Sequence, residues 1–101
     1  MYIYNITTKV SWQIQEAWLQ WMKEKHIPDI MQTGCFTDYR FSKLLEQDDS
    51  EGPTYAMMLF ADSLEHYQHY LDHFAPALRK EAGDNWGNAF IGFRSLMELV
   101  H

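Results

Sequence analysis

A histidine and an aspartate on either side of a proline, in the run His26-Ile27-Pro28-Asp29, have the clearest capacity for acid–base chemistry. Because Pro28 disfavours a helical conformation in the residue before it, we expect a helix to end here. His26 would then lie at the mouth of a cleft as a base or binding group, with Asp29 fixing its tautomer. In a plainer interpretation, both residues only stabilise helix ends. His26 interacts favourably with the negative C-terminal end of one helix dipole, and Asp29 with the positive N-terminal end of the next.

Charged residues on two predicted strands form a second candidate site. Asp38 and Arg40 on one strand, and Arg94 beside Asn5 on two others, are predicted to lie on the sheet face that no helix covers. An unpaired charge is costly among large apolar neighbours, so each arginine needs a partner. The arginines either pair with Asp38 and Glu98 across an interface with a second copy of the chain, which is the simpler interpretation, or hold an anionic ligand with their forked donors.

Three histidines on one predicted helix resemble a metal site. His66, His69 and His73 recur at spacings of three and four, which puts them on one side of a helix. That side lies opposite the apolar stripe, and no HExxH motif supports a zinc site. We therefore expect a solvated surface and no metal. The single cysteine, Cys35, has no base beside it and is expected to be a small buried residue, and no cofactor is predicted.

Six main elements must position these residues, in the order β-α-β-β-α-β. Strands are indicated by β-branched and aromatic segments or by a short apolar run between turn residues, and helices by apolar residues at helical spacing. The predicted elements are a strand at 2–9, a helix capped by Ser11 and ended by Pro28, a short turn at 28–33 stopped by Gly34, an extended segment at 35–45, a strand at 55–61 buried on both faces, a helix from Ser63, and a strand at 89–99.

The two long helices have clear apolar stripes. The first is formed by Ile14, Ala17, Trp18, Trp21 and Met22, and the second by Leu64, Tyr67, Leu71, Phe74 and Leu78. Pro76 is expected to bend or restart the second helix. The stretch GDNWGN after it is rich in turn-forming residues and is predicted to be a loop.

This order of elements predicts one α+β domain over residues 1–101 with the ferredoxin-like fold. Right-handed crossovers put both helices on one face of a four-stranded antiparallel sheet. The strands carry large apolar side chains on both sides, and the helices can cover only one. We therefore expect the other face to pair with a second copy of the chain, which makes a homodimer. In the alternative, some of these residues line a ligand pocket.

Composition excludes several classes of partner. The net charge of −6 argues against a general nucleic-acid binder and against an anionic membrane surface. The sequence shows no secretory signal and no apolar segment long enough to span a bilayer. With its lone cysteine, the chain is expected in the reducing cytoplasm.

Several segments resemble the signature of a small bacterial family of unknown function, found among the Bacteroidetes. The main one is the run from Trp18 to Phe36, with the pattern WxxWMxxxHIPDxMxTGxF. The others are Tyr55-Ala56, the segment Ala75 to Arg79, and the segment Phe90 to Glu98. The resemblance implies a dimeric α/β-barrel fold, in the broad company of antibiotic-biosynthesis monooxygenases, and it implies no reaction.

These observations predict an uncharacterised homodimeric module that binds a small organic ligand or another protein. The alternative is a small monooxygenase, either cofactor-free with His26 as the base or haem-dependent with a histidine as the axial ligand. The residues expected at a cleft or binding site are Asn5, His26, Asp29, Arg40 and Arg94.

Overall fold

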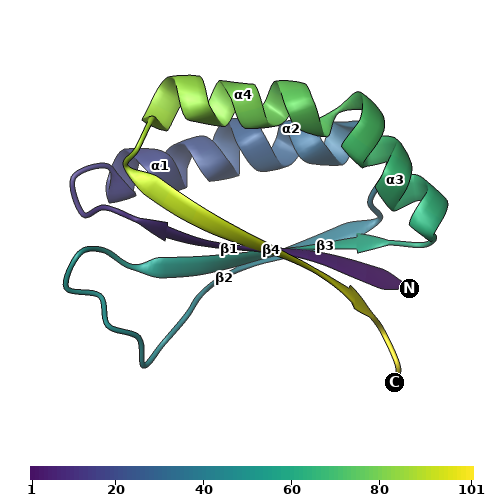
Figure 1. Ribbon diagram of the computed structural model, residues 1–101, viewed down its shortest axis with the longest axis horizontal. Helices are drawn as coiled ribbons and strands as arrows, with labels where there is room; N and C mark the ends of the chain where they lie inside the picture. The colour runs from purple at the N-terminus through teal and green to yellow at the C-terminus, as the bar shows by residue number, and fades with distance from the viewer.

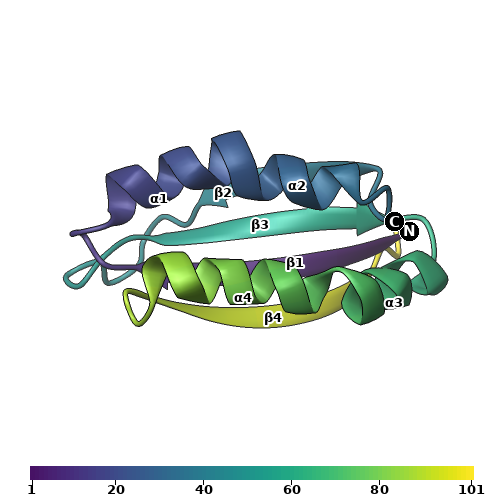
Figure 2. The same cartoon turned by 90° about the horizontal axis from the view of Figure 1, so that it is seen from above.

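Four antiparallel strands form one sheet in the order β2-β3-β1-β4, and all the helices lie on one of its faces (Figures 1 and 2). The computed structural model describes all of residues 1–101. This is the predicted ferredoxin-like arrangement. The elements are β1 (Tyr2–Val10), α1 (Gln15–Trp21), a π-helical segment η1 (Met22–His26), α2 (Ile27–Gln32), β2 (Asp38–Lys43), β3 (Thr54–Ala61), α3 (Leu64–His73), α4 (Ala75–Trp86) and β4 (Phe90–Glu98).

The first helix passes through Pro28 without ending, contrary to the prediction. The turn η1 is wide, with the amide of Ile27 donating to the carbonyl of Met22, and α2 follows with Pro28 in its first turn. Proline is tolerated in the first turn of a helix, because the backbone N–H that it lacks would have no acceptor within that helix. The predicted cap is also wrong, because α1 starts after Ile14 without a side-chain cap and the hydroxyl of Ser11 has no partner.

The second helical segment is divided at Pro76 and is longer than predicted. Ser63 caps α3 by accepting from the amide of His66, and Pro76 opens α4. The stretch expected as a loop is helical up to Trp86, and Gly87, at a φ of 56°, ends it. Trp86 packs edge-on against Trp21 at 5.7 Å between ring centroids. This contact extends the helix past the turn-forming residues.

Helix packing follows the predicted stripes with two exceptions. Ala17 is exposed, and Leu64 is 49% exposed at the start of α3. Tyr70, which lies outside the predicted stripe, is buried in its place. The buried apolar core comprises Tyr4, Val10, Trp18, Met22, Ile27, Ile30, Cys35, Phe36, Tyr55, Met57, Leu59, Ala61, Tyr70 and Ala75.

The strand register assigns each side chain to one of two faces. Cross-strand partners share a face, so the neighbours of buried Leu59 and Met57 lie under the helices. The strand β3 is therefore fully buried on one side only, whereas both sides were expected to be buried. We call the uncovered side the open face; its residues are Ile3, Asn5, Thr7, Lys9, Asp38, Arg40, Ser42, Ala56, Met58, Phe60, Ile91, Phe93, Ser95 and Met97. No helix has the length and apolar character needed to cross a bilayer.

Candidate functional site

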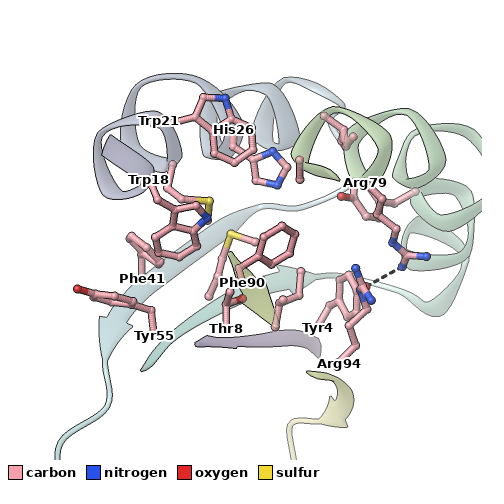
Figure 3. A pocket seen from close by; sticks show the side chains of 16 residues that line it. Tyr4, Thr8, Trp18, Trp21, His26, Phe41, Tyr55, Arg79, Phe90 and Arg94 are labelled. Carbon is pink, nitrogen blue, oxygen red and sulfur yellow. Dashed lines mark hydrogen bonds between the residues drawn. The ribbon is translucent and has the colours of Figure 1, made fainter. Parts of the chain in front are cut away.

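A cavity of about 90 Å³ lies between the covered face of the sheet and the helices (Figure 3). Every strand and four helical segments contribute to its walls, and 12 of its 16 lining residues are hydrophobic. These residues are Tyr4, Ile6, Thr8, Trp18, Trp21, Met22, His26, Phe41, Tyr55, Met57, Tyr70, Leu78, Arg79, Ala82, Phe90 and Arg94. A concave apolar site with a few polar groups is the usual character of a small-molecule site.

One end of the cavity is a wall of aromatic rings. The buried ring of Trp18 packs against Phe41 and Tyr55, at 5.9 and 5.5 Å between centroids. The hydroxyl of Tyr55 accepts a hydrogen bond of 3.0 Å from Nε2 of Gln15, which fixes that ring. Figure 3 shows these three rings on one side of the cavity, away from Arg79 and Arg94. This wall offers a rigid surface for an apolar ligand.

His26 lines the cavity from the last residue of the π-helical segment. Its ring stacks on Trp21 at 4.5 Å with an interplanar angle of 20°, and its buried Nδ1 has no hydrogen-bond partner. Burial lowers the pKa of His26, and the nearby carboxylates of Glu81 and Asp29 only partly oppose this effect. The imidazole is therefore neutral at pH 7 and can accept a proton or a hydrogen bond.

Asp29 does not take the role expected for it. Its Oδ2 lies 2.8 Å from Nζ of Lys25, which also approaches Glu81 at 3.3 Å. No hydrogen bond joins it to His26, and it lies outside the walls of the cavity. Asp29 therefore acts on His26 only through its charge, and no carboxylate fixes the imidazole tautomer.

The lowered pKa of His26 predicts acid sensitivity. Below its ordinary pKa of 6.5 the unfolded chain binds a proton at this position more readily than the folded chain does. The free energy of unfolding should therefore be highest above pH 6.5 and should fall as the pH drops toward the folded-state pKa. His26→Phe keeps an aromatic ring against Trp21 and cannot titrate. Urea unfolding at pH 7.5 and pH 5.5 should show a smaller loss of stability in this variant than in the wild type; an equal loss would contradict the assignment.

Two arginines occupy the other end of the cavity. Arg79 comes from α4 and donates from Nη2 to the hydroxyl of Tyr4 at 3.0 Å, and Arg94 comes from β4 (Figure 3). Tyr70 lies beside them, and burial is the main reason why its pKa is raised to about 12. Its hydroxyl therefore stays protonated at pH 7 and remains a donor. This end of the cavity is polar and positively charged.

The structure separates the residues that were expected together on the sheet. Arg94 pairs in register with Ile6, whose side chain lines the cavity, so Arg94 lies on the covered face. The prediction that it lies on the open face beside Asn5 is therefore wrong. On the open face, Asn5 donates to Thr7 at 3.0 Å, and Arg40 pairs with Asp38 at 2.8 Å, two residues before it in the same strand.

Sequence reasoning missed Arg79 as a cavity residue. The helical stripe predicted for this region stopped at Leu78, and GDNWGN was predicted to be a loop. In a helix that continues to Trp86, residues 75, 78, 79 and 82 share one face, at spacings of three and four. Extending the stripe by one turn would have placed Arg79 and Ala82 beside Leu78.

The remaining candidates lie away from the cavity. His66, His69 and His73 are exposed on α3, with the rings of His69 and His73 4.4 Å apart. No group of three or more histidine, cysteine or acidic side chains is arranged to hold a metal ion. Cys35 is buried and unpaired, as predicted, with Sγ 3.8 Å from the carbonyl oxygen of Thr33.

Comparison with known proteins gives a family and a fold. Residues 1–100 match the model of DUF4286, a domain of unknown function. The chain belongs to this family. No curated protein matches the chain. The DUF4286 chain is also similar to solved structures at low identity, and these relatives support the fold alone.

Three solved structures illustrate this likeness. A dimeric ferredoxin-like protein from an uncultured marine organism has a TM-score of 0.72 at 17% identity, covering 100% of this chain and 96% of that one. A candidate antibiotic biosynthesis monooxygenase from Deinococcus radiodurans has a TM-score of 0.70 at 14% identity, covering 100% and 94%. An ethyl tert-butyl ether d (EthD) family protein from Bacillus halodurans has a TM-score of 0.68 at 15% identity, covering 99% and 100%. The DUF4286 chain thus has the ferredoxin-like fold.

Proposed function

We propose that this DUF4286 protein is a homodimeric module that binds a small, mainly apolar molecule in the cavity under its helices. The observation that carries the proposal is the lining of the cavity, which is apolar apart from a few groups that include His26, Arg79 and Arg94. Of these groups His26 has a buried Nδ1 without a hydrogen-bond partner, and leaving it unpaired costs free energy. A ligand that fills the space and pairs with His26 removes that cost.

The size of the cavity limits the ligand. Its volume is about 90 Å³, whereas an apolar cavity of about 150 Å³ is known to admit benzene and pockets for drug-sized ligands span about 300–1,000 Å³. The enclosed part of the ligand is therefore no larger than part of a ring or a short branched chain, and the rest of a one-ring ligand would extend toward the exposed arginines. A haem macrocycle does not fit this space, so we derive no haem chemistry from it.

The proposed partner on the open face is a second copy of the chain. Phe93 and Ile91 are 66% and 57% exposed there, and Met97 is 37% exposed. They extend from edge strand β4 toward the half-buried Met58 and Phe60 of β3. Large exposed apolar patches mark interfaces, and symmetric self-pairing is the commonest solution. Similar structures named as dimeric ferredoxin-like proteins support this choice of partner.

Toluene provides a direct test, because it is one ring with no polar group. We expect saturating toluene to raise the thermal midpoint of the wild type, since ligand that binds only the folded state stabilises it. For a domain of this size, each kcal/mol of binding stabilisation raises the midpoint by about 4–8 °C. Ala82 lines the cavity and Ala17 is exposed on α1. Ala82→Phe should abolish the toluene effect, and the matched control Ala17→Phe should retain it.

Two outcomes would contradict the proposal. Toluene could leave the midpoint of the wild type unchanged, or it could stabilise Ala82→Phe as much as the wild type. Circular dichroism of each variant without toluene checks that the substituted chains are folded. The comparison between the two phenylalanine variants separates filling of the cavity from a general effect of toluene on the protein surface.

A second candidate function is oxidation of the bound molecule by dioxygen. The observation that favours it is the neutral His26 imidazole, whose Nδ1 is buried and free in an apolar cavity. An acidic CH₂ group would give one proton to His26, and the carbanion would add dioxygen to form a peroxide anion. This anion would take the proton back from His26, and the hydroperoxide would lose water, with the second hydrogen of the CH₂ group, to leave a carbonyl group. Acetylacetone is small enough to serve as a probe. Oxygen uptake that His26→Phe abolishes would support this function, and no uptake by the wild type would remove it.

A further inference from the structure

The two arginines at the cavity have no acidic partner, although acidic residues outnumber basic ones by 14 to 8 in this chain. The ion pairs of the protein join Lys25 to Asp29 and Glu81, Arg40 to Asp38, and Lys80 to Asp84. None includes Arg79 or Arg94. In a protein with surplus carboxylates, two guanidinium groups at one end of an apolar cavity therefore remain available to an anion from outside the chain.

The two guanidinium groups act on the same small region from opposite layers. Arg79 comes from the helix layer and Arg94 from the sheet. The charges of both lower the pKa values of Tyr67 and Tyr70 against the larger effect of burial. Tyr4 links the two layers, because its hydroxyl accepts from Arg79 and its strand is paired with that of Arg94. Figure 3 shows both arginines gathered at the end of the cavity opposite Trp18 and Phe41.

We propose that Arg79 and Arg94 form an anion subsite, and that the ligand is a small apolar carboxylate. This inference rests on the proposed function, since the apolar part of the ligand occupies the cavity. A guanidinium group donates two parallel hydrogen bonds that match the two oxygens of a carboxylate. The aromatic wall of Trp18, Phe41 and Tyr55 receives the ring or short chain at the other end. The solvent-exposed arginines keep the charged group near water while the apolar part is buried.

Benzoate and benzyl alcohol test this inference, because they share a ring and differ in charge. Calorimetric titration of the wild type should show benzoate binding about tenfold or more tighter than benzyl alcohol, as expected for charge-assisted hydrogen bonds. Arg79→Gln and Arg94→Gln should each weaken benzoate binding by about tenfold and leave benzyl alcohol binding unchanged. Arg40 lies on the open face, so the control Arg40→Gln should change neither affinity.

The outcomes separate this inference from the function on which it rests. Equal affinity for the two compounds, or benzoate binding that neither glutamine variant weakens, would overturn the anion subsite and leave binding in the cavity intact. If the wild type binds toluene but not benzoate, the carboxylate assignment is wrong. If toluene, benzyl alcohol and benzoate all fail to bind, the proposed function falls as well. Unchanged benzyl alcohol binding in the arginine variants shows that these variants are folded.

Discussion

Replacement of Phe93 with aspartate is expected to convert the protein from a dimer to a monomer. Phe93 is 66% exposed in the single chain and lies on the open face, so the substitution leaves the core of the chain untouched. In the proposed dimer the same position is buried, and an unpaired buried charge costs about 3–5 kcal/mol. Because the symmetric interface contains this residue twice, the dimer dissociation constant should rise by a factor of about a hundred or more.

Sedimentation velocity measures this change directly. The wild type should sediment as a species of twice the chain mass of 12.0 kDa, and Phe93→Asp as a single chain of that mass. Leu64 is also exposed, at 49%, but lies at the start of α3, in the helix layer and outside the open face. The control Leu64→Asp should remain dimeric. A wild type that is monomeric at high concentration, or a Phe93→Asp variant that remains a dimer, would contradict the proposed interface.

Truncation of Trp18 to alanine is expected to have the largest effect on stability. Trp18 is 3% exposed, and its ring both fills the core and forms the aromatic wall of the cavity. Loss of a buried tryptophan side chain lowers the free energy of unfolding by about 3–5 kcal/mol, because the surrounding structure collapses only partly. Urea unfolding should show this loss. Trp12 is 49% exposed, and Trp12→Ala should cost much less.

The same variant tests the cavity, because the deleted ring leaves an indole-shaped space beside it. Indole added to Trp18→Ala should restore part of the lost stability, through binding to the folded state alone. The wild type has no space for indole beside its own Trp18 ring and should gain less. If indole stabilises both proteins equally, or neither, then Trp18 does not border an accessible cavity and the description of the aromatic wall is wrong.

Local sequence signals predicted the elements of the fold well. The strands predicted at 2–9 and 55–61 lie within one residue of the observed Tyr2–Val10 and Thr54–Ala61, because their composition and length left little alternative. The errors arose where tertiary contacts outweigh local preference. Pro28 was predicted to end a helix, but the wide turn before it accommodates the proline. The segment before Gly87 was predicted to be a loop, but the packing of Trp86 keeps it helical.

The candidate site was only partly predictable, for a different physical reason. His26 was recognised because its position in a short polar motif is visible in the sequence. Arg94 was placed on the wrong face because β4 carries large apolar side chains on both sides, so alternation alone does not say which side the helices cover. That choice is fixed by the pairing of Arg94 with Ile6, between residues far apart in the chain. Arg79 was missed because the helix that carries it was predicted to end too early.

The central claim is that a small molecule binds under the helices and not on the open face. The indole N–H resonances of the tryptophans report this directly in a ¹⁵N–¹H spectrum. Trp18 and Trp21 line the cavity, whereas the indole of Trp12 donates to the carbonyl of Asp49 at the surface. Titration with toluene should shift the signals of Trp18 and Trp21 and leave that of Trp12 in place. A titration that moves none of them, or moves Trp12 as far as the others, would contradict the claim.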